Sequence, residues 1–313
     1  MQRQSAFINP EGNHGSAVML KGALHCHTTR SDGKDSPEDV IRMYASKGYA
    51  FVSITDHNKY NYKNFASETN IIIVPGVETD SNILGDEIKY CFHTVSIGPS
   101  SEDGNGYVQD EVFKSVKVRD QFEFQRSLDR HHANNNMTFY CHPQWSSTPA
   151  RDFDRLTGNF AMEIWNSGVA VEYDELDSNA AYWDELLMQN IKIYGVAVDD
   201  GHKANHYGLG WVMVNAKPEL NAILAALKAG SFYSSCGPEI YDFYIDNGTA
   251  VVECSPCTSI SFVYGHHSIP IIRNSGRQIS RAEFKVPGFF RYVRVSVKDN
   301  SGRRAWSNPV FLN

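Results

Sequence analysis

The stretch LHCHTTRSDG, from Leu24 to Gly33, places two histidines one residue apart at the end of an apolar run and follows them with Asp32 in a turn. An apolar run that ends in turn residues is typical of a buried strand. Side chains at positions i and i+2 of a strand share a face, so His25 and His27 can both reach one ion. Whether other strands end in the same way decides what this stretch means.

Apolar runs alternate with helical patterns through the first two thirds of the chain. The predicted strands are 17–27, 49–57, 70–78, 89–97, 137–143, 160–166 and 191–200, and the predicted helices are 36–48, 120–135, 182–190 and 219–230. Such alternation is typical of parallel strands joined by crossover helices. About seven units of this kind predict an α/β fold, either a barrel or a strongly curled sheet.

The pattern changes after about Gly237, where short strands are separated by turn dipeptides such as Asn247-Gly248. Strands without helices between them predict a small antiparallel β-sandwich. We therefore expect a barrel over residues 1–237 and an all-β domain over residues 238–313. A lid, a dimerisation surface and a binding module all remain open as roles for the second domain.

The composition restricts the class of protein. The net charge of -7 argues against a general nucleic-acid-binding protein, which normally has a basic face. No apolar run approaches the ~20 residues of a membrane helix, and the N-terminal residues lack the apolar centre of a secretory signal. We expect a cytoplasmic protein with a small-molecule partner and leave its oligomeric state open.

The 6 cysteines do not predict a disulfide framework in a chain of this length. Cys254 and Cys257 form a single C-x-x-C motif without a second pair, so we interpret them as ordinary strand or turn residues. Cys26 and Cys141 adjoin histidines and point to the opposite face of their strands, which predicts a packing role.

Imidazoles and carboxylates follow one predicted strand after another. They are His25, His27, Asp32, Asp56, His57, Glu78, His93, His142, Asp200 and His202. In a parallel α/β barrel these strand ends gather on one face, where active sites form. Imidazole and carboxylate without thiolate suit Zn, Mn or Fe, and shared carboxylates suit more than one ion. The sequence therefore predicts a multinuclear metal site.

The ordered motifs HCH…SDG, ITDHN, PGVE, CFH, CHP and DGH resemble those of the PHP (polymerase and histidinol phosphatase) domain over roughly residues 20–236. The resemblance implies a distorted, TIM-like (β/α)7 barrel with two to three divalent ions. It also implies three sets of ligands: His25, His27, Glu78 and Asp200; the shared Glu78 with His93 and His142; and Asp32, His57 and His202.

Flanking motifs narrow the resemblance to the stand-alone CehA/McbA-like branch, which often carries a small β domain. They are NPEGNHGSAVMLKGALHCHTTRSDG, EIWN at 163–166, SFYSSCGPEI and AWSNPVF. Two acids are adjacent in the VDDG run, and the D-x-H spacing selects Asp200 over Asp199 as the ligand. We expect Asp56 and Asp199 to orient the ligands rather than to bind an ion.

Paired ions about 3.5–4 Å apart lower the pKa of a shared water, so a metal-bound hydroxide is expected to attack the substrate. We predict a phosphoesterase acting on a small phosphomonoester or a nucleotide-like phosphate, with a third ion stabilising the leaving oxygen or a phosphate oxygen. An amide, ester or carbamate hydrolase with the same ligands is the alternative, and a non-catalytic binding protein is a third reading. Arg30, Lys59, His206 and Trp145 are candidate substrate contacts, weighed against ordinary surface or packing roles.

Overall fold

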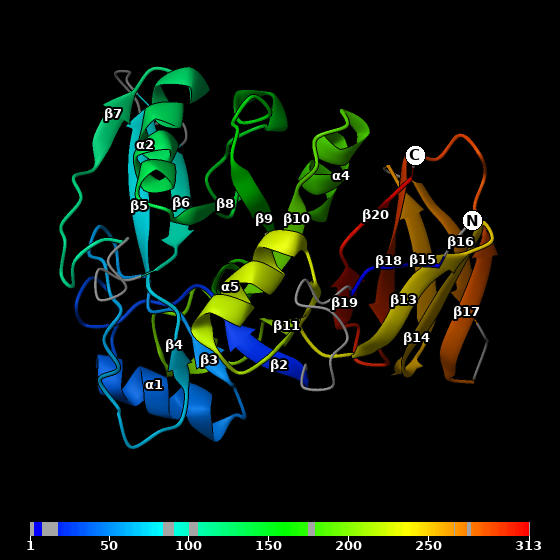
Figure 1. The fold of residues 1–313 in the computed structure, drawn as a ribbon, viewed down its shortest axis with the longest axis horizontal. Coiled ribbons are helices and arrows are strands. Elements are labelled where there is room, and N and C mark those ends of the chain that lie inside the picture. The colour runs from blue at the N-terminus through cyan, green and yellow to red at the C-terminus, as the bar shows by residue number, and fades with distance from the viewer. Residues whose placement is uncertain are drawn as a thin grey trace.

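The computed structural model describes residues 3–7, 18–83, 91–99, 106–174, 179–265, 267–273 and 277–312. The chain has mixed α/β content and forms two parts that lie side by side (Figure 1). The larger part contains every helix of the described residues, and the smaller part is made of strands.

One wall of the larger part grows from the strand that leads into His25. Strand β2 (Val18–Ala23) pairs in parallel with β3 (Phe51–Val52), which pairs in parallel with β4 (Ile72–Ile73). On its other side, β2 pairs antiparallel with β11 (Trp211–Ala216), and β11 pairs antiparallel with β12 (Phe232–Ser235). This wall therefore contains both strand directions.

A second sheet has the strand order β10-β9-β8-β6-β5-β7. Its strands are β5 (Gly76–Ile83), β6 (Cys91–Ile97), β7 (Val116–Val118), β8 (Met137–Tyr140), β9 (Asn159–Asn166) and β10 (Tyr194–Val198). Two isolated parallel bridges join the ends of the two sheets, Cys26 with Gly201 and His57 with Glu78. These bridges bring the ends of β2, β3, β5 and β10 to one place.

The pairings differ from the expected set of parallel strands. Strand β6 runs antiparallel to both β5 and β8. Only residues 84–90 separate β5 from β6, and a parallel connection needs a longer crossover. A regular (β/α)7 barrel is therefore not confirmed.

The helices lie between these strands in the chain. They are α1 (Pro37–Ser46), α2 (Gln121–Ala133), α3 (Ser167–Glu172), α4 (Ala180–Met188) and α5 (Leu220–Ala229), with short 3-10 turns at Ala150–Asp152 and Ala204–His206. Helix α1 begins after Ser36, whose hydroxyl caps it by accepting the N–H of Asp39. Helix α5 ends at Gly230, whose φ of 74° suits a residue without a side chain.

Every described pairing in the smaller part is antiparallel. One sheet contains β1 (Gln4–Ser5), β13 (Ile240–Asp246), β14 (Thr249–Cys257) and β17 (Ile279–Lys285). The other contains β15 (Ser259–Tyr264), β16 (His267–Arg273), β18 (Tyr292–Lys298), β19 (Arg304–Ser307) and β20 (Val310–Phe311). Phe243, Val252, Phe262 and Val295 belong to one buried core shared by the two sheets.

The two parts are joined by a sheet that runs through both of them. Strand β19 pairs with β12, so the second sheet of the smaller part continues without a break into β11, β2, β3 and β4. A buried ion pair adds to this connection, with Arg294 Nη2 on β18 2.6 Å from Asp184 Oδ2 on α4. The domain boundary between residues 237 and 238 stays a prediction.

All six cysteines are free, and Cys26 and Cys141 are buried as their packing role predicts. Among the described residues, no helix combines the length and apolar character needed to cross a bilayer. A cytoplasmic location stays a prediction.

Candidate metal centre

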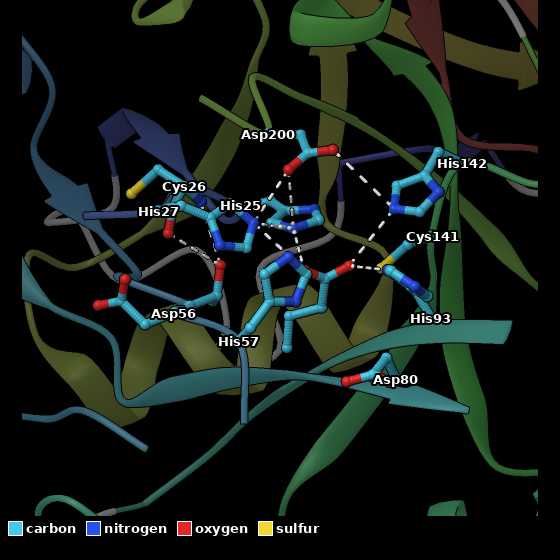
Figure 2. A network of polar contacts seen from close by, with 12 residues as sticks. His25, Cys26, His27, Asp56, His57, Asp80, His93, Cys141, His142 and Asp200 are labelled. Atoms are coloured by element: carbon cyan, nitrogen blue, oxygen red, sulfur yellow. Dashed lines mark hydrogen bonds and ion pairs between the residues drawn. The ribbon is translucent and has the colours of Figure 1, made fainter. Parts of the chain in front are cut away.

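The side chains expected at the strand ends meet at one place in the larger part. His25 and His27 follow β2, His57 follows β3, and His142 follows β8. Glu78 and His93 lie within β5 and β6, and Asp200 and His202 follow β10. In Figure 2 the imidazoles of His27, His57, His93 and His142 turn toward the middle of the network below Asp200, whereas Asp80 lies at its margin.

The deepest group contains His25, His27, Glu78 and Asp200, all buried. Glu78 Oε2 lies 3.3 Å from His25 Nε2 and 3.2 Å from His27 Nε2. Asp200 Oδ1 lies 3.3 and 3.0 Å from the same two nitrogens. The two imidazole nitrogens are 3.1 Å apart, so four donor atoms converge on one point.

The second group uses the other oxygen of the same carboxylate. Glu78 Oε1 lies 2.9 Å from His93 Nδ1 and 3.3 Å from His142 Nε2. His57 Nδ1 lies 3.1 Å from Glu78 Oε2, the oxygen that faces the first group. His57 is also close to His93, so it adjoins the second group as well. Glu78 therefore faces one set of imidazoles with each of its two oxygens.

The third group, nearer the surface, contains Asp32, His57 and His202, with His27 at its edge. Asp32 Oδ1 lies 3.5 Å from His202 Nε2, and Asp32 Oδ2 lies 3.7 Å from His57 Nε2. Asp32 also lies 3.7 Å from His27 Nδ1. The structure thus brings all nine expected ligands into three adjoining groups.

The donor atoms of the cluster are better placed to bind cations than to form hydrogen bonds with one another. Glu78 Oε2 and Asp200 Oδ1 are buried and accept no hydrogen bond from the described residues, although histidine nitrogens lie beside them. A buried carboxylate oxygen without a donor is costly, and nearly all such atoms in proteins have a partner. Oxygen and imidazole nitrogen together are the ligands that Zn, Mn and Fe accept.

The histidines of the cluster balance the negative charge of its carboxylates. Burial opposes ionisation of Glu78, but His57 and His25 outweigh it and hold the pKa of that carboxyl well below its usual range. Burial likewise opposes a charge on His27, yet Asp200 and Glu78 raise its pKa to about 9. Cations therefore compete with protons for this site, and binding them releases protons.

Two of these positions have a positive φ, as do six other non-glycine residues of the described chain. His142 has φ of 23° and Asp200 has φ of 48°, in the left-handed region that non-glycine residues rarely adopt. Such conformations persist where the surrounding structure holds them, and they cluster at functional sites.

Glu163 is a participant that the sequence reasoning missed. Its Oε1 lies 2.6 Å from His25 Nδ1, and its Oε2 accepts the backbone N–H of His142 at 2.9 Å. Asn166 donates both to Glu163 Oε2 at 3.0 Å and to Asp200 Oδ2 at 3.1 Å. Both residues belong to the EIWN motif, and an acid near the end of β9 was the available signal.

Asp56 and Asp199 lie beside the cluster, as expected, but bind to the chain around it. Asp56 accepts hydrogen bonds from the Thr28 N–H at 2.8 Å and the Ser31 hydroxyl at 2.8 Å, which holds the loop after His27. Asp199 accepts from the Tyr44 hydroxyl at 2.9 Å and from the N–H groups of Leu209 and Gly210 at 2.9 and 2.7 Å. Burial raises the pKa of Asp199.

The candidate substrate contacts divide into two pairs. Arg30 bonds to Asp110 and Asn61, and Lys59 lies 3.7 Å from Asp110; neither lines the cavity of about 320 Å³ over the metal cluster. Trp145 and His206 do line it. Trp145 packs against the rings of His93 and His142, at centroid distances of 5.8 and 4.9 Å.

His206 is only 1% exposed, and neither ring nitrogen has a hydrogen bond among the described residues. Its Nε2 lies 3.5 Å from Glu172 Oε1, which also accepts from Lys203 at 2.8 Å. Lys34 and Lys203 line the cavity as well, and the sequence reasoning did not select them.

Residues 23–164 match the family model described as "PHP domain". A stretch of 41 residues is 44% identical to the DNA polymerase/3'-5' exonuclease PolX of Bacillus subtilis, covering 13% of this chain and only 7% of that protein.

Solved structures with a similar arrangement include a two-domain protein from Bacteroides vulgatus described as containing a predicted PHP-like metal-dependent phosphoesterase. It has a TM-score of 0.48 and 12% identity and covers 95% of this chain and 88% of its own. A putative metal-dependent phosphoesterase from Bifidobacterium adolescentis has a TM-score of 0.42 and 12% identity, covering 66% and 96%. An amidohydrolase from Chromobacterium violaceum has a TM-score of 0.41 and 13% identity, covering 58% and 87%.

Proposed function

We propose that the protein is a metal-dependent phosphoesterase whose substrate is a small phosphomonoester or a nucleotide-like phosphate, a proposal supported by the match of residues 23–164 to the PHP domain model. The observation that carries the proposal is Glu78, whose Oε1 and Oε2 face separate sets of imidazoles 2.9–3.3 Å away. A carboxylate shared in this way is typical of sites with two or more ions.

Three sets of residues would hold the ions, which would be Zn, Mn or Fe. The first is His25, His27, Glu78 and Asp200; the second is Glu78 with His93 and His142, which lie 2.9 and 3.3 Å from its Oε1; the third is Asp32, His57 and His202. When bound, such ions polarise a phosphoryl oxygen and make water nucleophilic at neutral pH. Two ions suffice for this chemistry, and the third set gives the site room for three.

The chain's own residues prepare the site for an anion. Glu163 fixes the ring of His25 and the backbone of His142, so two ligands from different strands are held by one carboxylate. Lys34 adds positive charge to the cavity wall and would attract a phosphate, whereas Lys203 on the same wall is paired with Glu172 at 2.8 Å.

His206 and Trp145 are proposed to contact the substrate itself. His206 lines the cavity, and its ring nitrogens form no hydrogen bond with the described residues, although Glu172 Oε1 lies 3.5 Å from Nε2; we propose that His206 donates to a phosphate or leaving-group oxygen. Trp145 is 39% exposed and offers an apolar face to the non-phosphate portion of the substrate. Arg30 and Lys59 are not proposed as contacts, because they are engaged with Asp110 outside the cavity.

A substrate panel combined with metal analysis tests the proposal. Protein purified without chelator is expected to contain two to three transition-metal ions per chain and to hydrolyse p-nitrophenyl phosphate. Faster turnover of p-nitrophenyl acetate or an anilide would instead identify the amide, ester or carbamate hydrolase that the same ligands suit. Bound metal without any turnover on the panel would favour a binding protein.

A further inference from the structure

A second cavity, of about 510 Å³, opens where the two parts of the protein meet. It shares no described lining residue with the cavity over the metal cluster. Its lining includes Lys21 on β2, Trp211 on β11, and Arg304 and Trp306 on β19, strands of one continuous sheet (Figure 1). Its volume lies within the ~300–1,000 Å³ typical of small-molecule sites.

Tryptophan is concentrated around this cavity. Trp165, Trp211 and Trp306 line it, which is three of the 5 tryptophans in the chain. The rings of Trp165 and Trp306 have centroids 6.1 Å apart with their planes tilted by 32°. Trp165 and Trp211 are half-buried, so they retain surface toward the hollow. Such ring faces bind planar aromatic groups by stacking.

The charges around the cavity are all of one sign. Lys21, Arg303 and Arg304 line it, and none of its described lining residues is acidic. Arg303 pairs with Asp299 at 2.9 Å, outside the lining.

The other two cations have no ion-pair partner among the described residues, although the buried Asp199 is close enough to favour the charged form of Lys21. The Lys21 ammonium lies 4.1 Å from the centroid of the Trp211 ring and 4.2 Å from that of Tyr49. The Arg304 guanidinium has a long contact, 3.3 Å, to the Ser296 hydroxyl. Within the described ranges neither cation forms an ion pair, so both remain available to an anion.

We propose that this cavity, here called the Trp–Arg cavity, binds a planar aromatic molecule that carries one anionic group. The ring lies against the half-buried Trp165 and Trp211, with the buried Trp306 packed next to Trp165, and the anionic group is bound by Lys21 and Arg304. The inference does not depend on the reaction at the metal cluster, because the two cavities are separate.

Naphthalene-1-sulfonate is a suitable probe, since a phosphoesterase cannot hydrolyse it. Calorimetric titration of the metal-containing full chain is expected to show saturable one-to-one binding. Naphthalene-1-sulfonamide, which has the same ring without the charge, is expected to bind at least about tenfold more weakly. Arg304→Gln and Trp211→Leu are each expected to weaken sulfonate binding by at least about tenfold. The matched control Trp145→Leu, in the other cavity, is expected to leave the affinity unchanged.

Lys21→Gln provides a second test of the charge if Arg304→Gln does not fold, as judged by circular dichroism. Equal affinity for the sulfonate and the sulfonamide would overturn the proposal. So would sulfonate binding that is lost in Trp145→Leu but retained in Trp211→Leu, or the absence of saturable binding.

Discussion

Replacement of Glu78 by glutamine is the most informative test of the metal cluster. The substitution keeps the size of the side chain but removes its charge and replaces one of its two acceptor oxygens by an amide NH2 donor. Five histidines, His25, His27, His57, His93 and His142, have a ring nitrogen within 3.3 Å of this one carboxylate. Glu78 is therefore a proposed ligand of both of the first two groups.

The expected magnitude follows from charge and ligand count. The cluster offers three ligand carboxylates, Asp32, Glu78 and Asp200, so three divalent ions leave about three positive charges uncompensated. Removing Glu78 raises that excess and takes one ligand from each of the first two groups. We expect the loss of about two ions per chain and a fall in phosphatase activity of about 1,000-fold or more, since bound ions supply several kcal/mol to such reactions.

The assay measures metal content by mass spectrometry and turnover of p-nitrophenyl phosphate on the same preparation. Asp80→Asn is the matched control, because Asp80 lies on the same strand but bonds to Asn58 and Ser115. That control is expected to keep its metal and its activity. A Glu78→Gln protein that is folded and retains its full metal content would refute the shared-ligand reasoning.

Three further changes test other features. Glu163→Gln is expected to lower metal affinity about 10–100-fold while leaving some activity, because it loosens His25 and His142 without removing a ligand; chelator competition measures this. Arg294→Met leaves Asp184 buried and unpaired and is expected to cost about 3–5 kcal/mol of the free energy of unfolding, seen in urea titration; a change below about 1 kcal/mol would contradict a structural role for the pair. Burial lowers the pKa of His131 to about 3. Below about pH 6.5 the unfolded chain therefore binds a proton at His131 that the folded chain does not, and the free energy of unfolding falls as the pH is lowered. His131→Gln should therefore reduce the loss of stability between pH 8 and pH 5 by about 2 kcal/mol, and equal pH dependence in both proteins would show that His131 does not titrate this way.

The clustering of the expected ligands could be predicted from the sequence because their signal is local. Most of them lie in or just after an apolar run, and strand ends converge in α/β folds. His25 and His27 illustrate this, since the i and i+2 spacing favours the same side for both, and both belong to the deepest group. Strand direction was harder to predict. Nothing in the run around His93 distinguishes a parallel strand from the antiparallel β6, because both are buried and apolar.

Contacts between distant residues were also beyond the sequence pattern. Glu163 was visible as part of a motif, but its two oxygens reach residues 138 and 21 positions away, and no spacing rule predicts that. Arg30 lies outside the cavity lining for the same reason, because it pairs with Asp110, which is far along the chain. Lys34 and Lys203 become relevant only when the loops after β2 and β10 are seen to share one wall.

The unbroken sheet that runs from β19 through β12 to β2 has a mechanical consequence. The C-terminal strands cannot form a hinged lid, because rotating them away would break backbone hydrogen bonds within a single sheet. For the same reason, a truncated protein ending at residue 237 would leave β12 with an uncovered edge open to other chains, and we expect it to aggregate rather than to yield a working catalytic fragment.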